Sequence, residues 1–284
     1  MSPDSPVSHS PVSHSRATSS PTGILVITGT GTGVGKTIAT AAIAAVASAA
    51  GKSVAVVKPA QTGVNPDDPD NSDVPDLDTV TRLSGVTDTH ELARFPDPLS
   101  PEAAARTSGR PPLDMTAAAD YIAKLAAERD LVVVEGAGGL LVRYDPAGHT
   151  LADLAITLSA RPPATRALGA RTLSAPVLVV AAAGLGTLNH TALTHEALRA
   201  RRLRTAGIVI GSWPRHPGLA DQQNLADLPQ AAAAPIVGIL PEAAGILGRD
   251  EFLAMARSAL APPLGGTRPS IDGNNHDKLI SLIA

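Results

Sequence analysis

Six short, almost wholly apolar runs set the strongest limit on how this chain can fold. They lie at residues 24–28, 54–58, 131–135, 176–182, 206–211 and 236–240. Because polar residues do not alternate with apolar ones inside them, each run predicts a strand that is covered on both faces. Stretches with helical character separate these runs, notably 37–51, 114–130 and 189–202. The pattern predicts an α/β fold: a single-domain, doubly wound and mostly parallel sheet over residues 22–245.

The two ends of the chain differ from this pattern. Residues 1–21 are rich in Ser and Pro and repeat the sequence PVSHS at 6–10 and 11–15. Such a composition has too little apolar surface to form a core, so we expect a disordered tail. Residues 246–284 predict a C-terminal helix, at about 251–260, followed by a loose tail.

Composition excludes several classes of function. The chain has no cysteine, which removes disulfides, thiolate metal sites and thiol catalysis and fits a reducing compartment. A net charge of −3 gives no electrostatic argument for a nucleic-acid or membrane partner. No apolar run reaches the roughly 20 residues of a membrane span, and the N-terminus lacks a secretion signal. We therefore expect a cytoplasmic protein.

A glycine-rich segment, GTGTGVGKT at 29–37, joins the first predicted strand to the first predicted helix. Glycines let successive backbone N–H groups converge on an anion, and the helix dipole adds to the attraction. Lys36 would reach the outer phosphates of a nucleotide and the Thr37 hydroxyl would bind Mg²⁺. The alternative is a plain glycine turn. The flanking strand and helix favour a phosphate-binding loop, and so a P-loop NTPase type of fold. Gly29 lies six residues before Gly35, one more than in the common loop.

Two further predicted strands end in charged residues. Lys58 ends the second run, and we expect its strand to lie parallel beside that of the glycine loop, with the amine facing the loop. Thr62 could donate a hydrogen bond to the same ligand. The alternative for Lys58 is an ordinary surface lysine.

Glu135 ends the third run and precedes Gly136 and Gly138. A carboxylate at this place holds magnesium or its water in P-loop enzymes, and glycines let the backbone approach a ligand. Its alternative role is a helix cap. Within the acidic segment 65–82, only a residue at the start of the next helix would be held firmly; position alone does not decide between Asp76 and Asp78.

As a set, these motifs resemble those of the dethiobiotin synthetase family. The matching segments are TGTGTGVGKT, VKPAQTG, DPLSPEAAA, VEGAGG, TLAD, LGTLNH and PIVGILP, which together cover about 23–245. The resemblance implies an ATP-dependent cyclo-ligase that joins CO2 to 7,8-diaminononanoate, closing the cyclic urea of dethiobiotin. It also implies Mg²⁺ as cofactor and a homodimer as assembly.

The resemblance assigns roles to particular residues. Lys36 and Lys58 would supply catalytic positive charge to the transferred phosphate and the carbamate. Thr37, Asp76 and Glu135 would hold Mg²⁺; Asp76 is chosen because the metal aspartate lies six residues before the residue that matches Arg82. The nucleotide would contact Gly33, Val34, Gly35, Lys36, Thr37, Ile38, Asp76, Glu135, Gly136, Ala137, Gly138, Gly211 and Ser212. The substrate would contact Thr62 and, across the dimer, Gly186, Thr187, Leu188 and Asn189.

The two tails, 1–21 and about 262–284, match nothing in the family pattern, and two features between them depart from it. Many members have an asparagine that reads adenine where this chain has Gly211 and Ser212, so other nucleoside triphosphates could serve. Residues 161–175 interrupt the expected sequence; a tolerated surface insertion is one interpretation, and basic contacts to substrate or partner are the other.

Two rival classes share the phosphate loop. A partitioning ATPase of the ParA/MinD type carries a second lysine early in its loop, where this chain has Thr30 and Gly31. A cobyrinate-type amidotransferase normally has a glutaminase domain with a cysteine nucleophile, and this chain has no cysteine.

Overall fold

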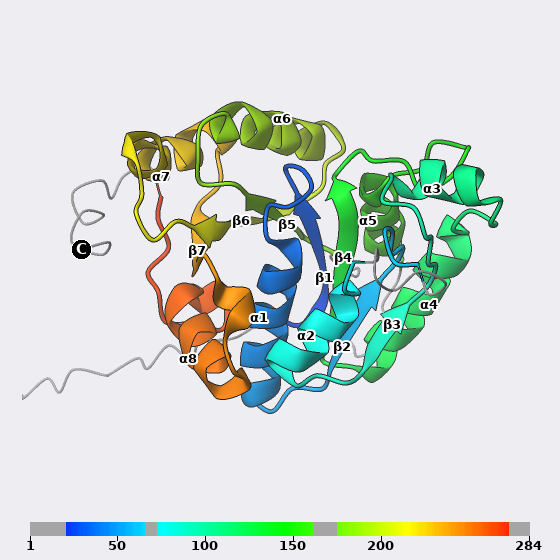
Figure 1. Cartoon of the computed structure of the whole chain (residues 1–284), viewed down its shortest axis with the longest axis horizontal. Coiled ribbons are helices and arrows are strands. Elements are labelled where there is room, and N and C mark those ends of the chain that lie inside the picture. The colour runs from blue at the N-terminus through cyan, green and yellow to red at the C-terminus, as the bar shows by residue number, and fades with distance from the viewer. Residues whose placement is uncertain (1–20, 66–72, 162–174, 273–284) are drawn as a thin grey trace, which may run out of the picture.

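The computed structural model describes residues 21–65, 73–161 and 175–272 (Figure 1). The predicted N-terminal tail lies outside these residues except for Pro21. The predicted insertion lies outside them except for Arg161 and Ala175. The proposed domain limits therefore stay a prediction.

The described residues form one seven-stranded sheet in the order β3-β2-β4-β1-β5-β6-β7. The strands are β1 (Gly23–Gly29), β2 (Val54–Lys58), β3 (Thr89–Glu91), β4 (Leu131–Gly139), β5 (Val177–Ala181), β6 (Thr205–Trp213) and β7 (Ile236–Pro241). Every neighbouring pair of these strands is parallel. All seven strands therefore end at the same edge of the sheet, which is the edge where such folds bind ligands.

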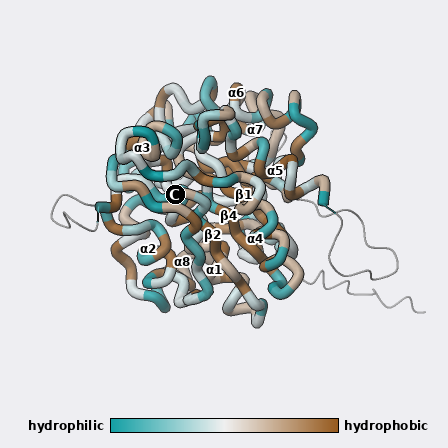
Figure 2. Tube along the Cα trace, turned by 90° about the vertical axis from the view of Figure 1, so that its right-hand side faces the viewer, coloured by the Kyte–Doolittle hydropathy of each residue, from teal (hydrophilic) through white to brown (hydrophobic). Residues whose placement is uncertain are grey.

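Helices cover both faces of the sheet (Figure 1). They are α1 (Lys36–Ala49), α2 (Asp76–Ser84), α3 (Pro101–Ser108), α4 (Met115–Glu128), α5 (Leu151–Ala160), α6 (Thr187–Ala200), α7 (Leu219–Ala232) and α8 (Arg249–Ala259). Helices α1, α2 and α8 pack on one face through residues such as Ile27 and Val133, whereas α4 and α5 pack on the other through Val26 and Val134. Figure 2 shows the hydrophobic strands β1, β2 and β4 inside this sandwich.

The predicted fold class is confirmed: the sheet is doubly wound and each of the six predicted strands is present. The sequence analysis missed β3, because a three-residue edge strand with the sequence Thr-His-Glu carries no apolar run. The sequence analysis predicted that β2 lies directly beside β1, and this prediction was wrong. β4 lies between β2 and β1 and pairs with both, so Lys58 lies beside Glu135 and one strand away from the glycine loop.

The segment after α8 differs from the loose tail expected there. Gly238 bridges to Leu260 and Ile236 to Ile271, so the chain returns antiparallel along the outer side of β7. Leu260, Leu264 and Ile271 are buried, and this burial holds residues 260–272 against the domain. Residues 273–284 lie outside the described residues.

Within the described ranges, no helix has the length and apolar character needed to cross a membrane.

Candidate active site

The glycine loop between β1 and α1 is held by close backbone packing. Gly33 and Gly35 adopt φ values of 75° and 94°, which a residue with a side chain rarely adopts. A Cβ on Gly35 would lie 2.4 Å from the carbonyl oxygen of Gly211, and a Cβ on Gly211 would lie 2.0 Å from that of Val34. The loop therefore rests directly on the backbone of β6, a contact that needs glycine on both sides.

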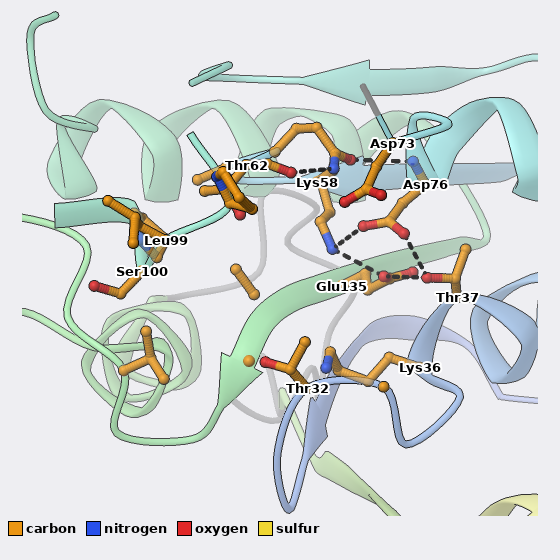
Figure 3. A pocket seen from close by; sticks show the side chains of 18 of the residues that line it. Thr32, Lys36, Thr37, Lys58, Thr62, Asp73, Asp76, Leu99, Ser100 and Glu135 are labelled. Atoms are coloured by element: carbon orange, nitrogen blue, oxygen red, sulfur yellow. Dashed lines mark hydrogen bonds and ion pairs between the residues drawn. The ribbon is translucent and has the colours of Figure 1, made fainter. Parts of the chain in front are cut away.

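A cavity of about 800 Å³ opens between this loop and the ends of β2 and β4 (Figure 3). It is lined by eleven of the predicted site residues: Gly33, Gly35, Lys36, Thr37, Ile38, Lys58, Thr62, Asp76, Glu135, Ala137 and Gly138. Residues that the sequence analysis did not assign complete the wall, among them Thr32, Gln61, Asp73, Leu99 and Ser100. Its volume is in the range of small-molecule sites, roughly 300–1,000 Å³.

Four side chains form one polar cluster at the back of the cavity (Figure 3). Lys58 Nζ lies 2.6 Å from Asp76 Oδ2 and 2.9 Å from Glu135 Oε1, and it donates to the carbonyl oxygen of Gly136 at 3.2 Å. The Thr37 hydroxyl lies 2.7 Å from Asp76 Oδ1 and 3.0 Å from Glu135 Oε1. Three separate elements and the start of α1 thus meet at this cluster.

The two lysines of the site have different electrostatic environments. Burial opposes the charge of Lys58, but Glu135 and Asp76 more than offset it and hold the pKa of Lys58 above its ordinary value. For Asp76, burial is outweighed by Lys58 and Thr37, so its pKa is lowered. Burial, and then the charge of Lys58, lower the pKa of Lys36, whose Nζ donates to the carbonyl oxygen of Gly31 at 3.0 Å. Lys58 is therefore a permanent cation at neutral pH.

The oxygen atoms of this cluster fit a hard divalent cation. Two carboxylates and one hydroxyl converge within hydrogen-bonding distance, and oxygen is the ligand that Mg²⁺ prefers. Glu135 is fully buried, and its Oε2 has no hydrogen-bond partner among the described residues. A buried carboxylate oxygen without a partner is costly unless a ligand satisfies it.

Two residues support the cluster from outside it. Gln61 Oε1 accepts from the backbone N–H of Asp76 at 3.1 Å, while Gln61 Nε2 donates to the carbonyl oxygen of Thr62 at 3.1 Å. Tyr144 is fully buried, and its hydroxyl accepts from the backbone N–H of Ala137 at 2.7 Å. The sequence analysis missed both; Gln61 stands inside the motif VKPAQTG, whereas nothing in the sequence marks Tyr144.

Replacing Tyr144 by phenylalanine is expected to lower the free energy of unfolding by about 1–3 kcal/mol, because the N–H of Ala137 loses its buried acceptor. Urea denaturation would measure this loss. Tyr121 provides the matched control, because its hydroxyl bonds to His90 Nδ1 at an exposed position. Tyr121→Phe should change the free energy by less than about 0.5 kcal/mol. Equal effects of the two substitutions would contradict the role of the Tyr144 hydroxyl.

Several predicted site residues do not line the large cavity. Val34 packs against the core beside α1, and Gly136 contributes its carbonyl oxygen to Lys58. Gly211 is buried under the glycine loop and Ser212 is exposed beyond it. The predicted substrate-carboxylate contacts Gly186, Thr187, Leu188 and Asn189 lie at the start of α6, and Gly186 adopts a φ of 90° there.

The glycine loop, the lysine at the start of α1 and the carboxylate of Glu135 within β4, four residues before the end of that strand, define a P-loop NTPase. The sequence family described as an AAA domain matches residues 24–161 and 164–247. Among the curated relatives, the ATP-dependent dethiobiotin synthetase BioD of Frankia casuarinae is 58% identical over 243 residues, covering 86% of this chain and 94% of the relative. That of Streptomyces avermitilis is 56% identical over 244 residues, with the same coverage. The chain belongs to the dethiobiotin synthetase family.

Among solved structures, the cell division ATPase MinD of Pyrococcus furiosus is similar at a TM-score of 0.44 and 17% identity, covering 92% of this chain and 98% of that one. A likeness of this size carries no argument about function. The curated relatives are named as dethiobiotin synthetases, so the partitioning-ATPase alternative is not favoured.

Proposed function

We propose that this protein is an ATP- and Mg²⁺-dependent cyclo-ligase that converts 7,8-diaminononanoate and CO2 into dethiobiotin, with release of ADP and phosphate. Membership of the dethiobiotin synthetase family supports the general class, an ATP-dependent ligase of biotin biosynthesis. In the proposed reaction one amine captures CO2 as a carbamate, and the γ-phosphate of ATP is transferred to the carbamate oxygen. The second amine then attacks the carbonyl carbon, and phosphate leaves as the cyclic urea closes.

The observation that carries this proposal is that two lysines, from different elements, line the same cavity. A carbamate and a transferred phosphate both carry negative charge on oxygen, and fixed cations in a water-poor site stabilise such charge. Lys36 lies at the glycine loop, where the phosphates are expected to bind. Lys58 lies across the cavity, held as a cation by Asp76 and Glu135. Its role is therefore electrostatic, and it does not act as a base.

Mg²⁺ would be held by Thr37, Asp76 and Glu135, whose oxygens already converge. When bound, the ion would neutralise charge on the phosphate oxygens. The protein's own contribution is to keep these oxygens together: Gln61 accepts from the N–H of Asp76, and the β4 end is fixed by Tyr144 through Ala137.

The diamine would occupy the side of the cavity formed by Thr62, Leu99 and Ser100 (Figure 3). Its carboxylate would bind the backbone at the start of α6, at Gly186–Asn189 of the partner subunit in a homodimer. We propose that the enzyme acts in the cytoplasm.

Recognition of the nucleotide base is expected to be weak. Gly211 has no side chain and its backbone lies against Val34 and Gly35, while the Ser212 side chain is exposed. Base contacts therefore depend on main-chain groups and on one small hydroxyl, so nucleoside triphosphates other than ATP are expected to support turnover.

The testing experiment measures ADP release by the purified protein with Mg²⁺ and bicarbonate, with and without 7,8-diaminononanoate. Dethiobiotin is measured in parallel by mass spectrometry, and the four nucleoside triphosphates are compared. ADP release that depends on the diamine, with one dethiobiotin formed for each ADP, would support the proposed ligase activity. Release that does not need the diamine would contradict it and favour a partitioning ATPase.

Replacing Asp76 by asparagine is expected to raise the Mg²⁺ concentration needed for half-maximal ADP release by at least about tenfold, because a charged ligand becomes neutral. Asp78→Asn is the matched control, since Asp78 shares the first turn of α2 and is exposed. A Mg²⁺ titration of both variants checks this. An equal shift in both variants would show that general charge on α2, and not a ligand, is responsible.

A further inference from the structure

A second cavity, of about 260 Å³, lies at the outer edge of the sheet, beside the end of β7. Its lining residues come from the ends of β6 and β7, from α8 and from the returning C-terminal segment: Trp213, Ile239, Pro241, Met255, Ser258, Ala259 and Arg268. None of them lines the large cavity. The family resemblance assigns no role to any of these residues.

Arg268 is the one charged residue of this lining. Its backbone N–H donates to the carbonyl oxygen of Leu260 at 2.9 Å, which fixes the segment at the mouth of the cavity. Its guanidinium has no hydrogen bond or ion pair in the described part of the chain, and burial lowers the pKa of Arg268. In contrast, the partly buried Arg94 pairs with Glu91 at 2.6 Å, and Arg129 pairs with Asp88 at 2.7 Å.

A guanidinium that loses much of its hydration without a counter-charge lowers the stability of the folded chain. The backbone around Arg268 is nevertheless ordered by the bridge of Ile271 to Ile236 and by the Leu260 contact. An anion in the cavity would supply the missing partner, and a planar guanidinium binds a planar carboxylate through two parallel hydrogen bonds.

The remaining lining residues indicate what chemistry the rest of the ligand would have. Trp213, Ile239, Pro241, Met255 and Ala259 present apolar surface. Ser258 adds a hydroxyl, but it already donates to the carbonyl oxygen of Met255 at 2.9 Å. A phosphate carries more charge and accepts more hydrogen bonds than the single guanidinium of this lining supplies. A single guanidinium beside an apolar wall suits a ligand that has one carboxylate attached to an apolar chain or ring.

We infer that the cavity between β7, α8 and the C-terminal segment is a binding site for a small monocarboxylate with an apolar body, anchored by Arg268 and packed on Trp213. The volume, just below the roughly 300–1,000 Å³ of drug-sized ligand sites, restricts the occupant to a small molecule.

The experiment titrates octanoate into the purified protein and follows tryptophan fluorescence. Trp213 is the single tryptophan of the chain, so the signal comes from the cavity itself. Isothermal calorimetry gives the stoichiometry. Octanamide, which has the same body without the charge, is titrated in parallel. Arg268→Gln is compared with Arg257→Gln, a matched control on α8 whose residue is exposed and does not line the cavity.

The expected result is saturable binding of one octanoate, weakened at least tenfold in Arg268→Gln, which corresponds to about 1.4 kcal/mol. Binding to Arg257→Gln should be unchanged, and octanamide should bind at least tenfold more weakly than octanoate. Equal binding of octanoate and octanamide to the unmodified protein would overturn the inference, whatever the folding of the variants. Displacement of octanoate by MgATP would also overturn it, because the cavity would then be part of the nucleotide site.

Discussion

Replacing Lys58 by methionine is expected to lower diamine-dependent ADP release by about 10²–10³-fold, the usual effect of removing one preorganised donor from a developing charge. Methionine keeps a similar length and an apolar stem but has no ammonium group. The loss should appear in kcat more than in KM for the nucleotide, because Lys36 and the glycine loop remain. A variant with normal turnover would remove Lys58 from the mechanism.

The same substitution should destabilise the apo protein at neutral pH by about 3–5 kcal/mol, because it leaves two carboxylates close together without their buried cation. In the unmodified protein the pKa of Lys58 is raised above its ordinary value of 10.5. The charge of Lys58 therefore stabilises the folded protein fully below pH 10.5, and this stabilisation is lost only as pH rises through the pKa of Lys58 in the folded protein. The pKa of Asp76 is lowered below its ordinary value of 3.8. The charge of Asp76 therefore stabilises the folded protein fully above pH 3.8, and this stabilisation is lost as pH falls through the pKa of Asp76 in the folded protein. Between these limits Lys58 and Asp76 keep their charges.

In Lys58→Met the effect on the pKa of Asp76 is the opposite, because the cation that lowered this pKa is gone. Without the ammonium group, the negative charge of Glu135 beside Asp76 favours protonation of Asp76. The stability difference from the unmodified protein should therefore shrink as pH falls from about 8 to 5. Urea unfolding at several pH values in EDTA measures it. Lys124→Met, at an exposed position on α4, is the control and should show no such trend.

Replacing Gly211 by alanine is expected to reduce nucleotide turnover by about 10²-fold and the free energy of unfolding by about 1–3 kcal/mol. The added Cβ would lie 2.0 Å from the carbonyl oxygen of Val34 and 2.6 Å from Val180 Cγ1. Because the first of these contacts is with backbone, no side-chain rotation relieves it. The glycine loop must shift away from β6, and Lys36 shifts with it.

Gly31→Ala is the matched control for stability, since it lies in the same loop and a Cβ there meets no atom within 4 Å. Its free energy of unfolding, measured without nucleotide, should change by less than about 0.5 kcal/mol. If Gly211→Ala were as stable as Gly31→Ala and bound nucleotide normally, the contact between β6 and the loop would not position the site.

The large elements of the fold were predictable because each leaves a local pattern. Apolar runs predicted β1, β2, β4, β5, β6 and β7, and the glycine loop predicted the nucleotide edge of the sheet. The short β3 and the packing of residues 260–272 left no such pattern, because their order depends on pairing with a distant strand.

The choice between Asp76 and Asp78 shows the same limit within the site. Both stand in the first turn of α2, and the residues by themselves left the choice open. In the structure Asp76 contacts Lys58 and Thr37, whereas Asp78 is exposed. The direction of a helix relative to a distant strand decides which of two neighbouring side chains reaches the cavity.

The sequence by itself determined the strands, the phosphate-binding loop and the chemical types of the site residues, because these depend on local composition and spacing. The tertiary structure alone decided that β4 separates β2 from β1, that Tyr144 supports Ala137, that Gly211 lies under the loop and that Arg268 has no counter-charge in its cavity. These are contacts between residues far apart along the chain, and they exist only once the sheet and its two helical layers have packed.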